Sequence, residues 1–463
     1  MMKTNSSTEQ ADALAVFSTM PVPTAVFKNA LPAMVAMLMV LVYNLADTFF
    51  IGQTHNALMV AAVSLATPVF LFFMAIGTIF GIGGTSVISR ALGEGRQAYA
   101  RQVSAFCLWS CIVIGIIMSV GLWVCMDVVL QFIGASEATW DMAKTYLQIV
   151  LLSGPFVLIG NCYSNVLRAE GQSTKAMMGM LLGNMLNVVL DPLMILYFGW
   201  DIAGAAIATV LGNIVGAGYY LGYFYSGKSL LSISWQDCLA SRGVVSGVLA
   251  IGVPASLGSI LMSVSSIILN SHIVNYGDMA VAGIGVAVKV TMMTSMVCIG
   301  LGQGVQPLLG YCVGAKNWQR YKRVMRFALL FALLLSIVLT VLCYVFVGQI
   351  VGAFVTDKSA LSYGIEFAKI LLSTNVLFGV FYVLINALQA MGAATPSLLI
   401  SISRQGLIYI PAMYLLEIAF GIKGLIWAQP IADVLSLVLA TVLYLGVKNK
   451  MTKEEILTRG IEK

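Results

Sequence analysis

Charged residues are scarce in this sequence. Only 10% of its 463 residues are Asp, Glu, Lys or Arg, whereas 60% are hydrophobic. A soluble domain has about 25% charged residues, so this chain is not a soluble globular protein. The same composition excludes disordered, collagen-like and coiled-coil chains. It also excludes an outer-membrane barrel, whose strands alternate apolar and polar residues, because the apolar runs here continue for about 20 positions.

Residues that bind metals or act as nucleophiles are also few. The chain has two histidines, His55 and His272, and eight scattered cysteines without a Cys-x-x-Cys pair. A His/Cys metal site is therefore not expected, and no cofactor is predicted. A polytopic membrane enzyme would need clustered nucleophiles, histidines or metal ligands near an interface, which the sequence lacks. We therefore predict that the protein is not an enzyme.

What the sequence does contain is a series of long hydrophobic runs, which predict twelve membrane spans. Each is long enough to cross about 30 Å of hydrocarbon at about 1.5 Å per residue. The runs cover residues 24–50, 58–82, 103–125, 142–167, 175–198, 203–224, 247–275, 280–308, 325–350, 362–390, 397–420 and 425–447. The residues up to Met20 are polar and do not have the pattern of a cleaved signal peptide. The sequence therefore predicts an all-α integral membrane protein.

The positions of the basic residues predict the orientation of these spans. If the N-terminus lies in the cytoplasm, most of the 25 Lys and Arg residues fall in inner connections, including Arg168 and Arg404. The basic residues that face outward are Lys144, Lys358, Lys369 and Lys423. Lys289 is left inside a span. Both termini are thus expected in the cytoplasm, and nucleic acid is not an expected partner because the basic residues mark loops rather than one surface.

The chain is also a tandem duplication. Pro32 recurs as Pro254, and Gly83 recurs as Gly304 at almost the same offset. Six spans per half give both halves the same orientation, related by an axis along the membrane normal. We predict an N-lobe over 24–227 and a C-lobe over 247–447, joined by a polar linker over 228–246, with cytoplasmic tails over 1–23 and 448–463. Two such six-helix bundles around a central cavity indicate a secondary transporter.

Four ionisable groups in the predicted spans are the candidates for a functional role, namely Asp47, Asp191, Lys289 and Asp433. A charge at the bilayer centre costs about 2.5–3.5 kcal/mol on insertion scales, so each group needs a role. We expect Lys289 and Asp433 to neutralise each other in the C-lobe. The alternative is that both line the cavity and contact the substrate.

The N-lobe groups belong to a polar stripe. Asp47 lies one helical turn after Tyr43, and Asn187 lies one turn before Asp191, while Thr209 brings a hydroxyl to a similar depth. Two acids, an amide and a hydroxyl can bind a proton or coordinate a hard cation such as Na⁺. The alternative is a structural polar network. The equivalent positions of the second half are apolar, which favours a coupling site confined to the N-lobe.

Several longer motifs extend these observations to a family. They are LPAM at 31–34, YNLADTFFIGQ at 43–53, LRAEGQSTKAMMGMLLGNMLNVVLDPLMI at 167–195 and GQGVQPLLGYCVGA at 302–315. Together they resemble the multidrug and toxic compound extrusion (MATE) transporters, in the bacterial DinF-like branch that includes MepA-like multidrug exporters. The resemblance extends over residues 32–447.

The resemblance implies a monomeric, twelve-helix, two-lobe antiporter in the bacterial cytoplasmic membrane. Such antiporters expel small, hydrophobic, often cationic drugs in exchange for H⁺ or Na⁺, and we favour H⁺ here. The implied coupling residues are Asp47, Asn187, Asp191 and Thr209, with Tyr43 nearby and Pro32 at a bend of the first helix. A flippase for a lipid-linked sugar, or an exporter of another anionic metabolite, is the alternative within the same superfamily.

The sequence departs from the family at two places. NorM-type members have acids on helices 7 and 10 of the C-lobe, where this chain has Met262 and Phe378. A C-lobe cation site of that kind is therefore not expected. MepA-like relatives often have Asn at the position of Asp47, so the details of their coupling do not transfer unchanged.

Overall fold

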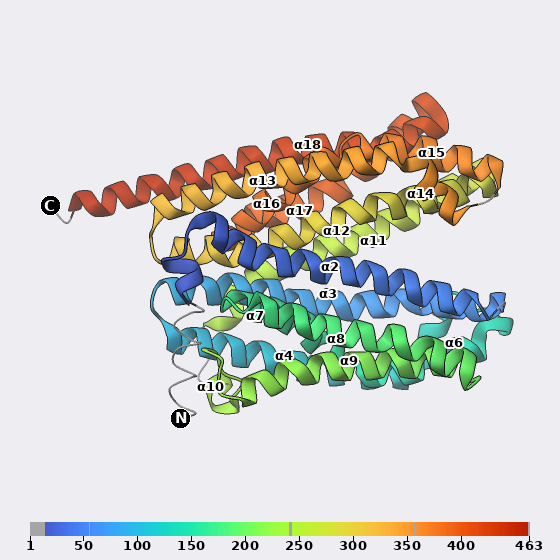
Figure 1. The fold of residues 1–463 in the computed structure, drawn as a ribbon, viewed down its shortest axis with the longest axis horizontal. Helices are drawn as coiled ribbons and strands as arrows, with labels where there is room; N and C mark the ends of the chain where they lie inside the picture. The colour runs from blue at the N-terminus through green and yellow to red at the C-terminus, as the bar shows by residue number, and fades with distance from the viewer. Residues whose placement is uncertain (1–13, 55, 240–242, 356, 462–463) are drawn as a thin grey trace.

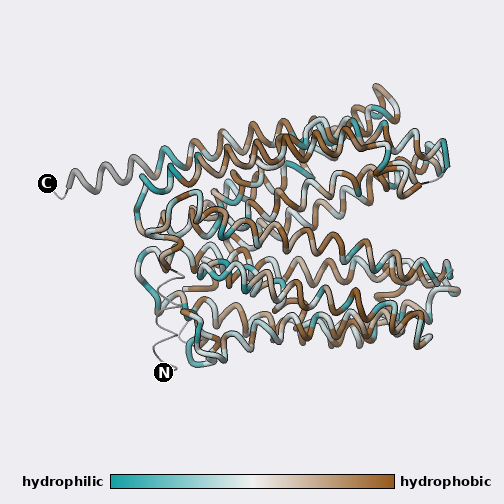
Figure 2. The backbone as a smooth tube through the Cα atoms, viewed as in Figure 1, coloured by the Kyte–Doolittle hydropathy of each residue, from teal (hydrophilic) through white to brown (hydrophobic). Residues whose placement is uncertain are grey.

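A computed structural model of the chain describes residues 14–54, 56–239, 243–355 and 357–461. Helices make up nearly all of this part of the chain, and they are arranged as two bundles (Figure 1). Hydrophobic residues extend along most of the helices, and hydrophilic residues gather at their ends and in the connections (Figure 2). Eleven of the described helical runs are long and apolar enough to cross a membrane.

The N-lobe consists of residues from α2 to α9. Its helices are α2 (Val22–Gly52), α3 (Ala57–Gly93), α4 (Gln97–Val124), α5 (Met126–Phe132), α6 (Glu137–Val150), α7 (Gly154–Ala169), α8 (Ser173–Pro192) and α9 (Asp201–Tyr225). A 3-10 turn over Leu151–Ser153 joins α6 to α7 in one long span. After Pro192, the chain continues as a π-helix over Leu193–Tyr197. Proline cannot donate the backbone hydrogen bond that a regular α-helix requires there.

The C-lobe repeats this arrangement. Its helices are α11 (Val244–Ile273), α12 (Asp278–Gly314), α13 (Trp318–Val345), α14 (Val347–Phe354), α15 (Lys358–Leu372), α16 (Phe378–Ala390), α17 (Ala394–Ile402) and α18 (Tyr409–Ile461). Two short helices, η4 (Asn375–Leu377) and η5 (Ser403–Leu407), join α15 to α16 and α17 to α18. Gly421 interrupts α18 with a φ of 61°. The eleventh run, Ala394–Met451, therefore contains both of the last two predicted spans.

The predicted linker and tails have some structure of their own. A short helix, α10 (Trp235–Leu239), lies in the linker, where the Trp235 ring packs edge-on against Trp109. At the N-terminal side, Phe17 is buried and stacks on Tyr311 of α12. At the C-terminal side, α18 continues to Ile461, so residues 448–461 of the predicted tail are a helical extension of the last span. Residues 1–13 and 462–463 of the tails lie outside the described residues.

The two lobes approach each other closely at the end where α3 and α12 finish, which we call the closed end. Gly304 of α12 lies so near α2 that an added Cβ would be 2.4 Å from the Cα of Ala30. A Cβ on Gly252 of α11 would be 2.0 Å from the carbonyl oxygen of Ile79 on α3. Because only glycine permits such approach, these glycines position the lobes. Toward the opposite end, the helices of the two lobes diverge (Figure 1).

Candidate functional site

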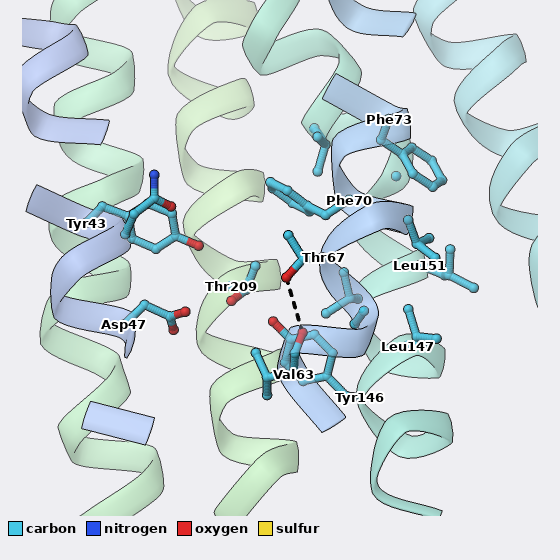
Figure 3. A pocket seen from close by; sticks show the side chains of 16 residues that line it. Tyr43, Asp47, Val63, Thr67, Phe70, Phe73, Tyr146, Leu147, Leu151 and Thr209 are labelled. Carbon is cyan, nitrogen blue, oxygen red and sulfur yellow. Dashed lines mark hydrogen bonds between the residues drawn. The ribbon is translucent and has the colours of Figure 1, made fainter. Parts of the chain in front are cut away.

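The predicted coupling residues come together inside the N-lobe from three helices. Asp47 and Tyr43 extend from α2 toward Thr209 of α9 (Figure 3). Asn187 and Asp191 lie on α8, on the face that packs against α2 and α9. The side chains of Asn187, Asp191 and Thr209 are buried. The stripe predicted from sequence spacing is therefore one cluster in space.

The amide of Asn187 connects this cluster. In the orientation that satisfies both ends, its nitrogen donates to the Asp191 carboxylate at 2.8 Å and its oxygen accepts from the backbone N–H of Thr209 at 3.1 Å. The Thr209 hydroxyl in turn donates to the Ala205 carbonyl at 3.0 Å. These bonds fix α8 against α9 and hold one side of the Asp191 carboxylate in place.

The carboxyl groups of Asp47 and Asp191 lie close enough for the charge of one to affect the other. The Oδ1 atom of each is buried and has no hydrogen-bond partner among the described residues. Two adjacent carboxylates repel each other unless they share a proton or a bound cation. Buried polar atoms are normally hydrogen-bonded, so the two free oxygens indicate where such a proton or cation would bind.

A cavity of about 110 Å³ adjoins Asp47 of this pair. Asp47, Tyr43 and Thr209 line it on one side, and the rings of Phe70 and Tyr146 line it on another (Figure 3). It therefore combines a carboxylate with aromatic surface. No group of three or more His, Cys, Asp or Glu side chains that could hold a metal occurs within the described part of the chain. Two carboxylates, an amide and a hydroxyl are the oxygen donors that the cluster offers.

Pro32 lies inside α2, which continues as one helix from Val22 to Gly52. The residues that follow it, Ala33 and Met34, pack against Gly300 of α12. Pro32 is thus close to the contact between the lobes at the closed end. The bend implied at this position stays a prediction.

The predicted pairing of Lys289 with Asp433 is wrong. Lys289 lies over the ring of Phe354, with its Nζ 5.3 Å from the ring centroid. Asp433 instead accepts hydrogen bonds from the Nε of Arg404 at 2.9 Å and from the amide of Gln429 at 2.9 Å. The Thr374 hydroxyl also contacts it at 3.4 Å.

Arg404 is a residue that sequence analysis placed incorrectly. The prediction that it lies in an inner connection is wrong. Arg404 belongs to η5, inside the run that spans Ala394–Met451. Its side chain is only 11% exposed. A lone Arg between Ser403 and Gln405 resembles a loop in the sequence. Arg404 also falls within an otherwise apolar run, and this signal could have identified it as a residue inside the membrane.

A second cavity, of about 220 Å³, lies between the lobes. Its N-lobe wall includes Thr78, Asn161 and Asn165, and its C-lobe wall includes Gln303 and Arg404. Met262, which replaces a family acid, also lines this cavity. Phe378, which replaces the other, packs 4.9 Å from the Arg404 guanidinium. The C-lobe therefore has a buried ion pair between Arg404 and Asp433 beside this cavity.

Arg168 lies beside the interlobe cavity, whose walls include its partners Asn165 and Gln303. Although sequence analysis placed it in an inner connection, it is buried at the end of α7. Its guanidinium donates to Asn165 at 2.9 Å and, across the lobes, to Gln303 at 2.7 Å. The partner lies 135 positions away, so no local spacing could have indicated this contact.

Comparison with protein families gives the same two halves as the internal repeat. The MatE family model matches residues 32–193 and 254–415, which together are more than half of the chain. The chain belongs to the MatE family. MatE proteins include MATE multidrug efflux transporters, and this chain is accordingly a multi-pass membrane transporter. The family inferred from the sequence motifs is confirmed.

Two curated MatE relatives cover almost the full length of the chain. The multidrug export protein MepA of Staphylococcus aureus (strain NCTC 8325 / PS 47) is 29% identical over 436 residues, which are 94% of this chain and 96% of that protein. MepA of Staphylococcus haemolyticus (strain JCSC1435) is 29% identical over 431 residues, which are 93% of this chain and 95% of that protein.

Solved MATE structures have the same fold. A MATE in complex with MaL6 superposes with a TM-score of 0.89 at 24% identity, over 95% of this chain and 98% of that one. An outward-facing MATE family transporter superposes with a TM-score of 0.86 at 24% identity, over 92% of this chain and 95% of that one. The predicted all-α, two-bundle membrane fold is confirmed.

Proposed function

We propose that this MatE transporter is an antiporter that exports hydrophobic, often cationic compounds in exchange for H⁺. The observation that carries the proposal is that Asp47 and Asp191, which lie close enough to affect each other's charge, each have a buried oxygen without a hydrogen-bond partner among the described residues. Acidic groups inside membrane spans commonly mark proton or ion pathways. The similarity to MepA, a multidrug export protein, supports drugs as the substrates.

A single proton changes the charge of this pair without adding bulk. With one proton between them, Asp47 and Asp191 attract each other and hold α2 against α8. When the proton leaves, the two carboxylates repel, so α2 is released unless a cation takes the proton's place. A hydrophobic cation bound beside Phe70 and Tyr146 would supply that charge at Asp47. The proton and the substrate therefore favour different states of the N-lobe, which is the requirement for coupled exchange.

Movement of α2 would be transmitted to the C-lobe. Pro32 lies between the acidic pair and the closed end, where Ala33 and Met34 contact Gly300. A proline removes one backbone hydrogen bond and makes bending easier at that point. We propose that protonation from outside bends α2 near Pro32 and lowers the affinity for the drug.

In this arrangement, both termini lie in the cytoplasm of a bacterial cell and the protein acts as a monomer.

Uptake of dye into everted membrane vesicles, which corresponds to export from the cell, tests this proposal. Separate H⁺ and Na⁺ gradients would be imposed, and the transport of a cationic dye would be measured for the wild-type protein, Asp191→Asn and Asp141→Asn. We expect an H⁺ gradient to drive transport in the wild type and in Asp141→Asn, whose acid is exposed on α6, but not in Asp191→Asn. Transport driven by a Na⁺ gradient alone would mean that the coupling ion is Na⁺ and not H⁺. Wild-type transport by Asp191→Asn would overturn the assignment of the coupling site.

A further inference from the structure

Arg404 is held rigidly at the edge of the interlobe cavity. Its Nε donates to Asp433 at 2.9 Å, and its Nη1 donates to the Tyr382 hydroxyl at 3.3 Å. The rings of Phe378 and Phe381 lie 4.9 Å and 4.8 Å from the guanidinium carbon. Aromatic faces stabilise a guanidinium through cation–π attraction, so the side chain is fixed in position before any ligand arrives.

These contacts leave one nitrogen of the guanidinium available. Nη2 of Arg404 donates to no atom among the described residues. Arg404 is the one charged residue that lines the interlobe cavity within the described part of the chain, because Asp433 lies behind it and does not reach the cavity wall. A charged ligand group in this cavity would therefore meet a guanidinium first.

The rest of the cavity wall suits an anion attached to an apolar body. The hydroxyls of Ser259 and Ser401 and the amides of Asn161, Asn386 and Gln389 supply neutral polar groups. The other side is formed by apolar side chains that include Ile82, Met262, Ile299 and Ile385. Guanidinium groups recognise carboxylate and phosphate oxygens through short charge-assisted hydrogen bonds, and neutral donors can complete the set.

We propose that Arg404 forms an anion subsite in the interlobe cavity, which takes the carboxylate or phosphate monoester group of an amphipathic compound. The apolar body of that compound would lie against Met262 and Ile299. The proposal rests on the proposed export function, because it names a class of compound that the same transporter would carry. Asp433 stays on Nε and acts as the counter-ion while the subsite is empty or holds a neutral ligand.

The two charged partners should have opposite effects on anion binding. Loss of Arg404 removes the positive charge and the hydrogen-bond donor together. Replacement of Asp433 by Asn keeps a hydrogen-bond acceptor for Nε but removes the negative charge that competes with the ligand. Lys289 provides the matched control, since it is also a C-lobe cation inside the membrane but lies over Phe354 and does not line the cavity.

Fluorescence binding with an amphipathic anion tests the subsite. Full-length protein in nanodiscs of zwitterionic lipid would be titrated with 11-(dansylamino)undecanoate, using empty nanodiscs as the blank. We expect Arg404→Gln to weaken binding about tenfold or more, Asp433→Asn to strengthen it, and Lys289→Gln to leave it unchanged. The methyl ester of the probe should bind to the wild type as weakly as the acid binds to Arg404→Gln.

Competition experiments then identify the chemical group. Decanoate and decyl phosphate should both displace the probe, and the stronger competitor indicates whether a carboxylate or a phosphate is preferred. Displacement by decyltrimethylammonium with equal strength would overturn the anion assignment, as would unchanged binding in Arg404→Gln. Arg404→Lys controls for a folding defect, because it keeps the charge but lacks the fork of donors. We expect this variant to bind the probe with intermediate affinity. Binding no better than that of Arg404→Gln would contradict a charge-assisted subsite.

Failure of the subsite can be distinguished from failure of the proposed function. If anion binding depends on Arg404 but the wild type does not take up a cationic dye into everted vesicles, the proposed function is wrong and the subsite stands. If dye uptake is driven by H⁺ but anion binding is the same in Arg404→Gln, the subsite is wrong and the proposed function stands.

Discussion

Arg168 of the N-lobe donates a hydrogen bond to Gln303 of the C-lobe, with Nη1 2.7 Å from Oε1. Arg168 is buried, so its charge depends on Asn165 and Gln303 for the hydrogen bonds that water would otherwise provide. The contact lies between the interlobe cavity and the closed end. A transporter that alternates access must break it each time that this end opens, and the surrounding glycines determine how tightly the end closes.

Gly304→Val should open the closed end. The added Cβ would lie 2.4 Å from the Cα of Ala30 and 2.8 Å from the carbonyl oxygen of Asn29. These are backbone atoms that cannot rotate away, so the lobes must separate. We expect a longer distance between spin labels placed at Gln97 and Gln319, measured by double electron–electron resonance with the exposed Cys125 replaced by Ser.

The control for this experiment is Gly285→Val on the same helix. A Cβ at Gly285 would have nothing within 4 Å, so the label distance should stay that of the unsubstituted protein. Equal distances in Gly304→Val and Gly285→Val would show that the glycine contact does not hold the closed end together.

Glu170 should make stability depend on pH. Its carboxylate lies buried between α7 and α8 and accepts hydrogen bonds from the Ser229 hydroxyl at 2.6 Å and the Leu230 N–H at 3.1 Å, which anchor the start of the linker. Burial raises the pKa of Glu170 from 4.5 to about 7, although these hydrogen bonds act to lower it. Between these two values, the folded state holds a proton that the unfolded chain has released. Stability therefore falls as pH rises through this window, by up to about 3 kcal/mol.

The pH dependence can be measured by thermal unfolding in detergent. The unfolding temperature of the wild type should decrease as the pH is raised from 4.5 to about 7. The decrease should be smaller in Glu170→Gln because that side chain does not titrate. Glu137→Gln, which changes an exposed acid at the start of α6, should keep the wild-type slope. The same slope in Glu170→Gln and the wild type would mean that other groups cause the pH dependence.

Breaking the Arg404–Asp433 pair should cost more than removing it. Asp433→Ala leaves a buried guanidinium without its counter-ion, which typically costs about 3–5 kcal/mol, whereas replacement of both charges by apolar residues is often nearly neutral. We expect a large drop in the unfolding midpoint for Asp433→Ala and a small one for the double variant Arg404→Met/Asp433→Leu. A double variant as unstable as Asp433→Ala would show that the two residues do not act as a pair.

The coupling cluster could be predicted because its residues repeat with helical spacing. Asp47 follows Tyr43 by one turn, and Asn187 precedes Asp191 by one turn, so each pair falls on one helix face. The family motifs then indicated that these faces meet. Their meeting around Thr209 is visible only in the structure, because it depends on how α2, α8 and α9 pack.

The C-lobe cluster could not be predicted in the same way. Arg404 and Asp433 are separated by 29 positions, and their contact depends on the break at Gly421 that folds the last two spans together. In the sequence, Lys289 was the basic residue left inside a span, so it was the expected partner of Asp433. In the structure, an aromatic ring takes that role for Lys289, and Arg404 provides the opposite charge.

The most direct test of the account is proton release on substrate binding. A cationic dye such as ethidium would be added to purified protein in weakly buffered detergent solution, and the change in pH would be recorded for the wild type and for Asp47→Asn/Asp191→Asn. If the dye replaces a proton shared by the two acids, the wild type releases about one proton per dye bound and the double variant releases none. Equal release from both proteins would contradict the assignment of coupling to Asp47 and Asp191.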